Sequence, residues 1–287
     1  MKSIIGILVV ILCTLVSYVL EHGHIEVLWQ PLEAVIIIGS SIGAFITSNP
    51  PAVLKRTTKL LPLAFKKPKY NKQSYVELLS MLYQTFKLAK TKGMLALEAH
   101  IEKPDDSSLF QQFPGFLHDH HAVEFFCDYL RLVTLGSDKP HELEALMDAE
   151  IEVHHNEEHA VSDAIQNMAD GMPALGIVAA VLGVIMTMGA IAEPPEVLGH
   201  MIGGALVGTF LGVWTAYGYV APISNTLKAT FDLNGKYFIV IKTGLLAHLS
   251  GYAPSISIEY ARKAIDSDLR PSFLEMEEAT STLPAPG

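Results

Sequence analysis

The sequence predicts an all-α, polytopic membrane protein with four transmembrane helices and a helical cytoplasmic domain inserted between spans two and three. Half of its 287 residues are hydrophobic and only 17% are charged, which is unusual for a soluble enzyme. Four stretches are long enough to cross a bilayer and carry almost no charge. Elsewhere apolar residues recur at three- and four-residue spacing, without the alternation typical of strands.

The first two spans are expected at the start of the chain. Residues 3–20 contain no charged side chain and would form about 27 Å of helix, close to the hydrocarbon thickness. Lys2 precedes them as in a signal peptide, but no small-residue cleavage site follows, so we expect a retained anchor. Residues 28–48 form the second, weaker span, which Glu33 interrupts near its start. We expect Glu33, and His200 at the outer start of span four, to be interfacial residues rather than proton relays.

Spans three and four are predicted at residues 171–192 and 197–227, joined by the short turn 193–196. Neither span contains Asp, Glu, Lys or Arg. An ion path through lipid normally needs an ionisable group at depth. If this protein moves ions, the titrating carboxylate must therefore come from another chain.

The basic residues set the orientation of the spans. Residues 51–72 carry no acidic side chain, whereas the loops at 21–27 and 193–196 carry glutamates. Because loops rich in lysine and arginine stay inside the cell, we expect an inner or plasma membrane protein with both termini cytoplasmic. The seven basic residues are Lys55, Arg56, Lys59, Lys66, Lys67, Lys69 and Lys72.

This orientation divides the chain into four parts. We expect spans one and two at 1–49, a cytoplasmic helical domain at 50–170, spans three and four at 171–227, and a C-terminal helix and tail at 228–287. Helices are predicted at 75–99, with Gly93 as a weak point, and at 107–135, 140–168 and 224–265. We expect a disordered tail over 280–287.

Small residues and two prolines mark spans three and four. Small residues fall on one face of each span and let helix backbones approach closely. Such a face can pack within one subunit, and because both spans carry one, a contact between subunits or with a partner helix is favoured. Pro173 and Pro222 indicate helix boundaries, and as a pair at one membrane depth they predict a hinge. The small residues are Gly176, Ala180, Gly183 and Thr187 on span three, and Gly204, Gly208 and Gly212 on span four.

A short pattern of histidines and glutamates offers an enzyme alternative. Residues 155–159 read His-Asn-Glu-Glu-His, which satisfies a zinc peptidase pattern in which two histidines bind the metal. Histidines at 118, 120 and 121 could supply further ligands. Such patterns arise by chance in helices rich in these residues, so we expect a solvated face and no metal.

The stretch 171–183, Gly-Met-Pro-Ala-Leu-Gly-Ile-Val-Ala-Ala-Val-Leu-Gly, resembles the third-span signature of the flagellar motor stator A subunit, the MotA family. The resemblance covers nearly the whole chain. It includes residues 208–212, 216–218, 251–254, 270–275, 70–102 and 128–131.

The resemblance implies a torque generator with no enzymatic activity and no resident cofactor. In the family, a homo-pentamer of A subunits surrounds a dimer of a single-span B subunit, whose membrane aspartate binds and releases the coupling ion. Pro173 and Pro222 match prolines that couple protonation to movement of the cytoplasmic domain. Lys90, Glu98 and Glu150 match charged residues that contact the rotor switch protein FliG. Lys90 stands where arginine is common in the family. It therefore keeps the positive charge but cannot form the paired hydrogen bonds of an arginine guanidinium group.

The coupling ion is expected to be H⁺ rather than Na⁺. Ala180 occupies a position where sodium-driven relatives have threonine, and a methyl group cannot bind a cation. Thr209 leaves one hydroxyl near the expected path, too few for dehydrated sodium. Tyr217 is either a pore-side hydroxyl or an aromatic packed at the interface.

The nearest alternative is an energy-transducing proton channel subunit of the ExbB/TolQ type. Those relatives typically have three spans, whereas two spans precede the large insertion here. The number of spans therefore favours the flagellar branch. The expected partners are the B subunit, further copies of this chain, the rotor protein and membrane lipids. Nucleic acid is not expected as a partner, because the net charge is −10 and the charges are unevenly spread along the chain.

Overall fold

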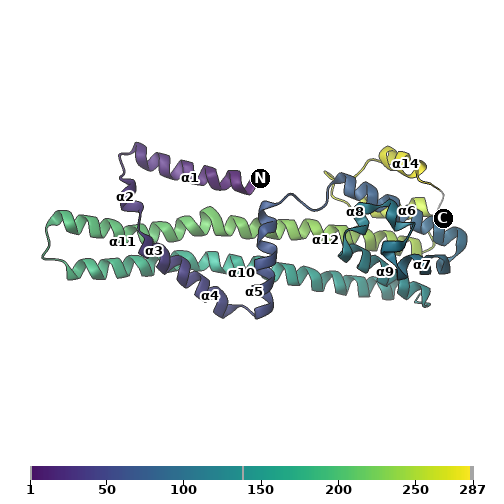
Figure 1. Cartoon of the computed structure of the whole chain (residues 1–287), viewed down its shortest axis with the longest axis horizontal. Coiled ribbons are helices and arrows are strands. Elements are labelled where there is room, and N and C mark those ends of the chain that lie inside the picture. Colours follow the sequence, from purple (N-terminus) through teal and green to yellow (C-terminus); the bar gives the residue numbers. More distant parts are fainter. Residues whose placement is uncertain (1, 138, 285–287) are drawn as a thin grey trace. The chain divides into compact units, whose positions relative to one another are not determined.

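The computed structural model describes residues 2–137 and 139–284, and every regular element among them is helical (Figure 1). The chain forms two compact units, which we call the membrane unit (Met1–Lys67 with Asn156–Phe231) and the second unit (Pro68–His155 with Asp232–Gly287). Four helices are long and apolar enough to cross a membrane. The predicted all-α fold with four membrane helices is confirmed.

The membrane unit begins with α1 and a broken second span. Pro31 starts α3, and Pro51 starts α5, at the first-turn position where a missing N–H costs no helix bond. Between them the second span widens into one π-helical turn. The elements are α1 (Lys2–Leu20), α2 (Ile25–Leu28), α3 (Pro31–Ala34), η1 (Val35–Gly39), α4 (Ser40–Ser48), α5 (Pro51–Leu60) and η2 (Leu61–Phe65).

Two long helical runs complete this unit and correct two predicted boundaries. Helix α10 (Pro140–Gly189) passes Pro173 without a break, so the helix predicted at 140–168 and span three are one element. Helix α11 (Pro195–Thr215) continues through the π-helical turn η6 (Ala216–Val220) into α12 (Ala221–Leu249), and Pro222 does not end it. The wider π turn takes up the clash that a proline ring makes with the preceding turn. Figure 1 shows α10 and α11 side by side.

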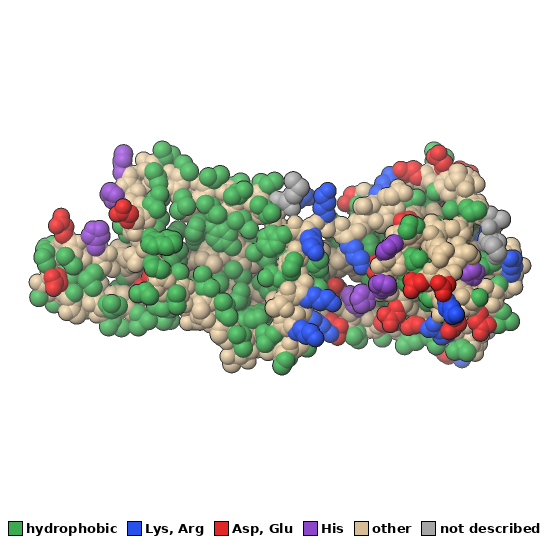
Figure 2. Space-filling model, viewed as in Figure 1, with side chains coloured by type: hydrophobic (Ala, Val, Ile, Leu, Met, Phe, Trp, Pro, Cys, Tyr) green, Lys and Arg blue, Asp and Glu red, His purple; other side chains and the backbone are tan. Residues whose placement is uncertain are grey.

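The surface of the membrane unit is apolar. On the face seen in Figure 2, hydrophobic side chains predominate over this unit, and charged side chains gather at its two ends. Ile5, Leu12 and Ile185 are each about 60% exposed, with 58%, 58% and 61% of their surface open. Exposed apolar patches of this extent are typical of surfaces that contact lipid. Together with the four apolar helices, this surface fits a membrane protein.

The second unit packs shorter helices around an aromatic core. Phe110, Phe116 and Phe126 contact one another and are fully buried. The elements outside α10 and α12 are α6 (Lys72–Lys92), η3 (Met94–Leu97), α7 (Glu98–Glu102), η4 (Pro104–Asp106), η5 (Phe110–Gln112), α8 (Pro114–Leu117), α9 (His120–Thr134), α13 (Pro254–Lys263) and α14 (Phe273–Ser281).

Three predicted helices of this unit end earlier than expected. Gly93 adopts φ 86° after α6, a conformation that favours glycine, so the helix predicted at 75–99 stops there. The helix predicted at 107–135 is divided, because Asp119 caps the start of α9. Gly251, with φ 88°, separates α12 from α13 within 224–265. Helix α14 extends to Ser281, into the predicted disordered tail, of which residues 285–287 lie outside the described residues.

Helix α14 is anchored by a charge that predicts acid sensitivity. Lys72 donates to Glu275 at 2.6 Å, and Ser272 and Glu275 form a capping box. The Lys72 hydrogen bond, followed by those from Ser272, lowers the pKa of Glu275 from 4.5 to about 2. A lowered folded-state pKa stabilises the protein above the unfolded value, and this stabilisation is lost as the pH falls towards 2.

We therefore expect α14 to detach on acidification from about pH 5 to about pH 2. NMR titration of the Glu275 carboxyl group, with thermal melts over this range, measures the effect. In Lys72→Met the midpoint of the Glu275 titration should rise towards that of an ordinary glutamate. An unchanged midpoint would contradict the assignment.

Candidate functional site

Helices α10 and α11 pack through glycines. A Cβ atom added to Gly176 would lie 2.8 Å from the carbonyl oxygen of Gly208 and 3.1 Å from the Cα of Gly212. A Cβ atom on Gly212 would lie 2.8 Å from the carbonyl oxygen of Met172. About two turns further along α10, a Cβ atom on Gly183 would lie 2.7 Å from the Cβ and 3.0 Å from the Cα of Ala205. We call this contact the glycine seam; it lies within one chain. A contact of the small-residue faces with another subunit or a partner helix stays a prediction.

The predicted ion-path residues lie beside this seam. The Cβ position of Gly208 is 3.1 Å from the backbone nitrogen of Ala180, which places Ala180 at the level of Gly208 and its neighbour Thr209. Ala180 and Thr209 are half-buried. Tyr217 lies in the π turn η6 and is 60% exposed. The structure thus brings Ala180 and Thr209 to one layer, and their role stays a prediction.

The two prolines lie next to buried residues of the same helices. Pro173 is half-buried and follows Met172, which packs with Ile37, Ala179 and Ala216 in one apolar cluster. Pro222 is exposed and directly follows the π turn and the buried Ala221. Both prolines are inside continuous helices, where each removes one backbone hydrogen bond. A hinge at these points remains a prediction.

Sequence reasoning expected Glu33 to be an interfacial residue near the outer rim and missed its approach to span four. One of its carboxylate oxygens is buried in the membrane unit and has no hydrogen-bond partner among the described residues. That oxygen lies 3.0 Å from the Cβ position of Gly208. The sequence offered one indication of this: Glu33 is the single charged residue between positions 27 and 54.

The residues predicted to contact a rotor are on the surface of the second unit. Lys90 is exposed in the last turn of α6, and Glu98 is exposed at the start of α7. Glu150 accepts a hydrogen bond from Tyr129 at 2.7 Å. Burial, followed by this hydrogen bond, raises the pKa of the Tyr129 phenol. Glu150 also lines a surface pocket of about 330 Å³ with Asp128 and Arg131. No hydrogen bond or ion pair among the described residues joins Lys90, Glu98 and Glu150 to one another.

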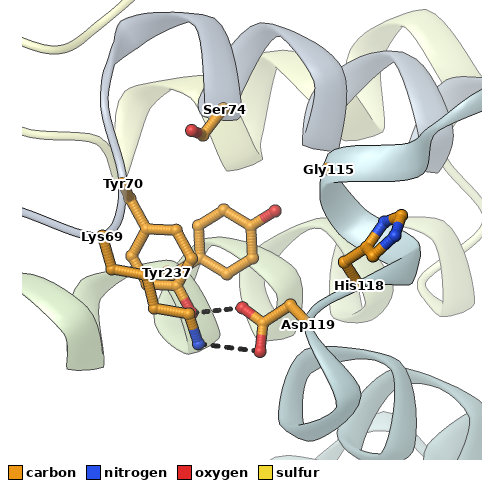
Figure 3. Close-up of a pocket in the computed structure, with 7 residues that line it drawn as sticks. All are labelled: Lys69, Tyr70, Ser74, Gly115, His118, Asp119 and Tyr237. Atoms are coloured by element: carbon orange, nitrogen blue, oxygen red, sulfur yellow. Dashed lines mark hydrogen bonds and ion pairs between the residues drawn. The ribbon is translucent and has the colours of Figure 1, made fainter.

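A buried carboxylate holds the start of the second unit together (Figure 3). Asp119 is 7% exposed and accepts hydrogen bonds from Tyr70 at 2.6 Å and from Lys69 at 2.8 Å. The Tyr70 ring stacks on Tyr237 of α12 at 3.9 Å between centroids. Burial, followed by the Asp119 charge and hydrogen bond, raises the pKa of Tyr70 far above its usual value, so its hydroxyl remains a donor.

Replacing Asp119 by alanine should therefore lower the thermal unfolding temperature of the purified chain by about 5 °C. The change leaves a buried phenol without an acceptor and removes a helix cap, together worth about 2 kcal/mol. Glu124→Gln, an exposed change on the same helix, serves as the control. Equal melting temperatures for the two variants would refute this role of Asp119.

The histidine pattern at 155–159 lies within α10. Its Glu157 forms an ion pair with Arg56 of α5 at 2.6 Å, so one acidic side chain of the pattern already serves a structural contact. The expectation that this segment holds no metal stays a prediction.

Comparison with known proteins places this arrangement in a family. Residues 4–93 match the family described as Motility protein A N-terminal, and residues 118–236 match the MotA/TolQ/ExbB proton channel family. The chain is 42% identical to Motility protein A of Salmonella typhimurium over 278 residues, covering 97% of this chain and 94% of that protein.

Two solved structures have the same fold. The flagellar MotAB stator complex from Bacillus subtilis contains a chain that is 28% identical, with a TM-score of 0.71, and the match covers 90% of this chain and 92% of that one. A chain of C. jejuni MotAB has a TM-score of 0.79 at 20% identity, covering 95% and 98%. This chain therefore belongs to the Motility protein A family, within the MotA/TolQ/ExbB proton channel family.

Proposed function

We propose that the chain is the stator A subunit of a bacterial flagellar motor, which forms a proton channel with a B subunit and converts ion-motive force into torque on the rotor. The carrying observation is the hairpin of α10 and α11. Its two spans pack backbone to backbone along the glycine seam, and no Asp, Glu, Lys or Arg occurs at 171–192 or 197–227. Such a hairpin shapes a path but needs an acidic group from a partner.

The partner that fits is a single-span, MotB-like B subunit. The Bacillus subtilis and C. jejuni structures are of MotAB assemblies, which supports a B subunit here. We propose a homo-pentamer of this chain around a B dimer. The complex lies in the inner membrane, in contact with its lipids, with both termini of this chain in the cytoplasm.

Protons are the proposed coupling ion. Ala180 presents a methyl group beside the glycine seam, and Thr209 in the same layer supplies one hydroxyl. Dehydrated sodium needs several oxygen ligands, whereas a proton needs only a chain of acceptors. In this proposal Pro173 and Pro222 pass the protonation event along α10 and α12, and Tyr217 lies beside the path.

The rotor protein, FliG, would be engaged by exposed charges of the second unit. We expect Lys90→Glu and Glu98→Lys each to lower swimming speed several-fold while the amount of assembled complex stays normal. Both residues are exposed. Exposed charges at an interface guide the approach and alignment of the partner, so reversing them should leave the fold of this chain intact. Lys263→Glu, an exposed charge reversal on α13, is the control. Normal swimming in both reversals would remove the assignment.

Motility in a defined host tests the proposed function. The chain is co-expressed with a candidate single-span B subunit in cells that lack both stator subunits, and swimming speed is measured while proton and sodium gradients are varied independently. We expect speed to follow the proton gradient and to vanish when the membrane aspartate of the B subunit is replaced by asparagine. Cells that stay non-motile with every B subunit would favour an ExbB/TolQ-like transducer, and speed that follows sodium alone would overturn the proton assignment.

A further inference from the structure

Glu33 has an unusual setting in the membrane unit. It belongs to the short helix α3 at the start of span two, and one turn earlier Gln30 faces span four in the same way. The Gln30 amide nitrogen lies 3.0 Å from the Cβ position of Gly204, and the Glu33 Oε2 atom lies 3.0 Å from that of Gly208. Two polar side chains thus lie over two glycines that are also one turn apart.

The space occupied by the Glu33 carboxyl group adjoins the predicted ion-path layer. The Cβ position of Gly208 that Glu33 approaches is also 3.1 Å from the Ala179 Cβ and 3.1 Å from the Ala180 nitrogen. Thr209 follows Gly208 directly. The carboxyl group therefore sits where spans two, three and four meet, at the level of Ala180 and Thr209.

The buried oxygen of Glu33 is unsatisfied within the chain. Oε2 has no hydrogen-bond partner among the described residues, although it is shielded from solvent. Burying an ionised carboxylate without a partner is costly, and ionisable residues kept in membrane spans are usually functional. Packing alone would be served equally well by a neutral side chain.

No neighbouring charge explains this carboxylate. At this level α10 and α11 contribute Ala179, Ala180 and two glycines, none of which ionises, and α2 contributes Val27 near Gly203. Along α11 the nearest titratable residues are His200, exposed and two turns nearer the start of the helix, and Tyr217. Glu33 is thus the one carboxylate among the described residues of this layer.

We propose that Glu33 is a proton-carrying group of the ion path, acting on the outer side, ahead of the acidic group of the B subunit. The proposal rests on the proposed function. A hydronium ion gives its proton to Oε2, so that an O–H bond forms and a water molecule remains. The carboxylic acid then returns the proton to a water molecule beside Ala180 and Thr209, which regenerates the carboxylate with no oxidation or reduction. The neutral, protonated carboxyl group of Glu33 is favoured by its buried position, and the ionised carboxylate attracts the next proton.

Two substitutions separate proton transfer from packing. Glu33→Gln keeps the shape of the side chain but cannot ionise, whereas Glu33→Asp is shorter but still titrates. Proton transfer predicts that Asp retains more activity than Gln, and packing predicts the opposite order. Glu26→Gln, an exposed acid before span two, is the matched control.

The measurements are proton flux into vesicles containing the purified complex of this chain with its B subunit, and swimming speed against external pH. We expect at least a tenfold loss of flux in Glu33→Gln, whereas Glu33→Asp keeps more of the flux and shifts the pH profile of swimming speed. Gln activity equal to or above that of Asp overturns the proposal. A wild-type complex that carries no protons would instead overturn the proposed function, so the two failures are distinguishable.

A measurement on the unmodified chain covers the case in which Glu33→Gln does not assemble. Dicyclohexylcarbodiimide reacts with protonated carboxyl groups in apolar surroundings, and mass spectrometry locates the adduct. We expect an adduct on Glu33 of the wild-type complex, increasing as external pH is lowered, and none on Glu26. Absence of the Glu33 adduct at every external pH overturns the proposal.

Discussion

Gly176→Ala is expected to abolish motility and to reduce the amount of complex recovered with the B subunit at least tenfold. The added Cβ would lie 2.8 Å from the Gly208 carbonyl oxygen and 3.1 Å from the Gly212 Cα. Both are backbone atoms, so no side-chain rotation relieves the contact and the helices must separate. Overpacking of this kind costs about 1–3 kcal/mol. Within lipid the loss is not offset, because close packing itself drives helix association there.

Gly171→Ala is the matched control for this prediction. It lies on the same helix, five residues away, and its Cβ would meet nothing within 4 Å. Alanine favours helix more than glycine, so this variant should assemble and swim at least as well as the wild type. Western blots of membranes, co-purification with the B subunit and swimming speed measure both variants. Similar behaviour of the two would refute the structural role of the glycine seam.

Pro222→Ala, and equally Pro173→Ala, is expected to stop swimming without loss of assembly. Pro222 cannot donate to the carbonyl of residue 218, and the π turn η6 lies directly before it. Alanine restores a donor and removes the ring clash, a change worth about 3 kcal/mol in favour of a regular helix. The local distortion that serves as the proposed hinge would then be lost.

The control for the two prolines is Pro195→Ala. Pro195 occupies the first turn of α11, where its N–H would have no helix partner in any case. We expect it to swim normally. Swimming speed and co-purification are measured for all three variants, and motility retained in both Pro173→Ala and Pro222→Ala would remove the hinge from the mechanism.

The class of fold and the membrane spans could be predicted because both depend on local composition. Charge-free runs of bilayer length need no knowledge of tertiary contacts. Helix ends were less predictable at the two prolines, since a proline removes one backbone bond while neighbouring packing and a π turn keep the helix continuous. Gly93, which we expected only as a weak point within the helix 75–99, ends that helix, because its positive φ lies outside the helical region.

Pairings between distant segments could not be predicted from the sequence. Asp119 belongs to a residue type that commonly caps helices. Its second function, accepting a hydrogen bond from the hydroxyl of Tyr70 some fifty positions earlier, leaves no pattern in the sequence. The approach of Glu33 to Gly208 is of the same kind. In contrast, Ala180 and Thr209 were named through a family resemblance, and the structure puts them in one layer without testing what they do.

The even spacing of Gly204, Gly208 and Gly212 has a consequence for how the hairpin finds its alignment. A face that repeats every four residues offers nearly equivalent offsets, each displaced by about one turn of 5.4 Å. Such a surface permits close approach but does not choose among these offsets. The choice falls to the connection containing Pro194 and Pro195, which is too short and too stiff to allow slippage. Residues inserted into this connection would allow α10 and α11 to pack about one turn out of register, with the glycines of the seam still at helix contacts.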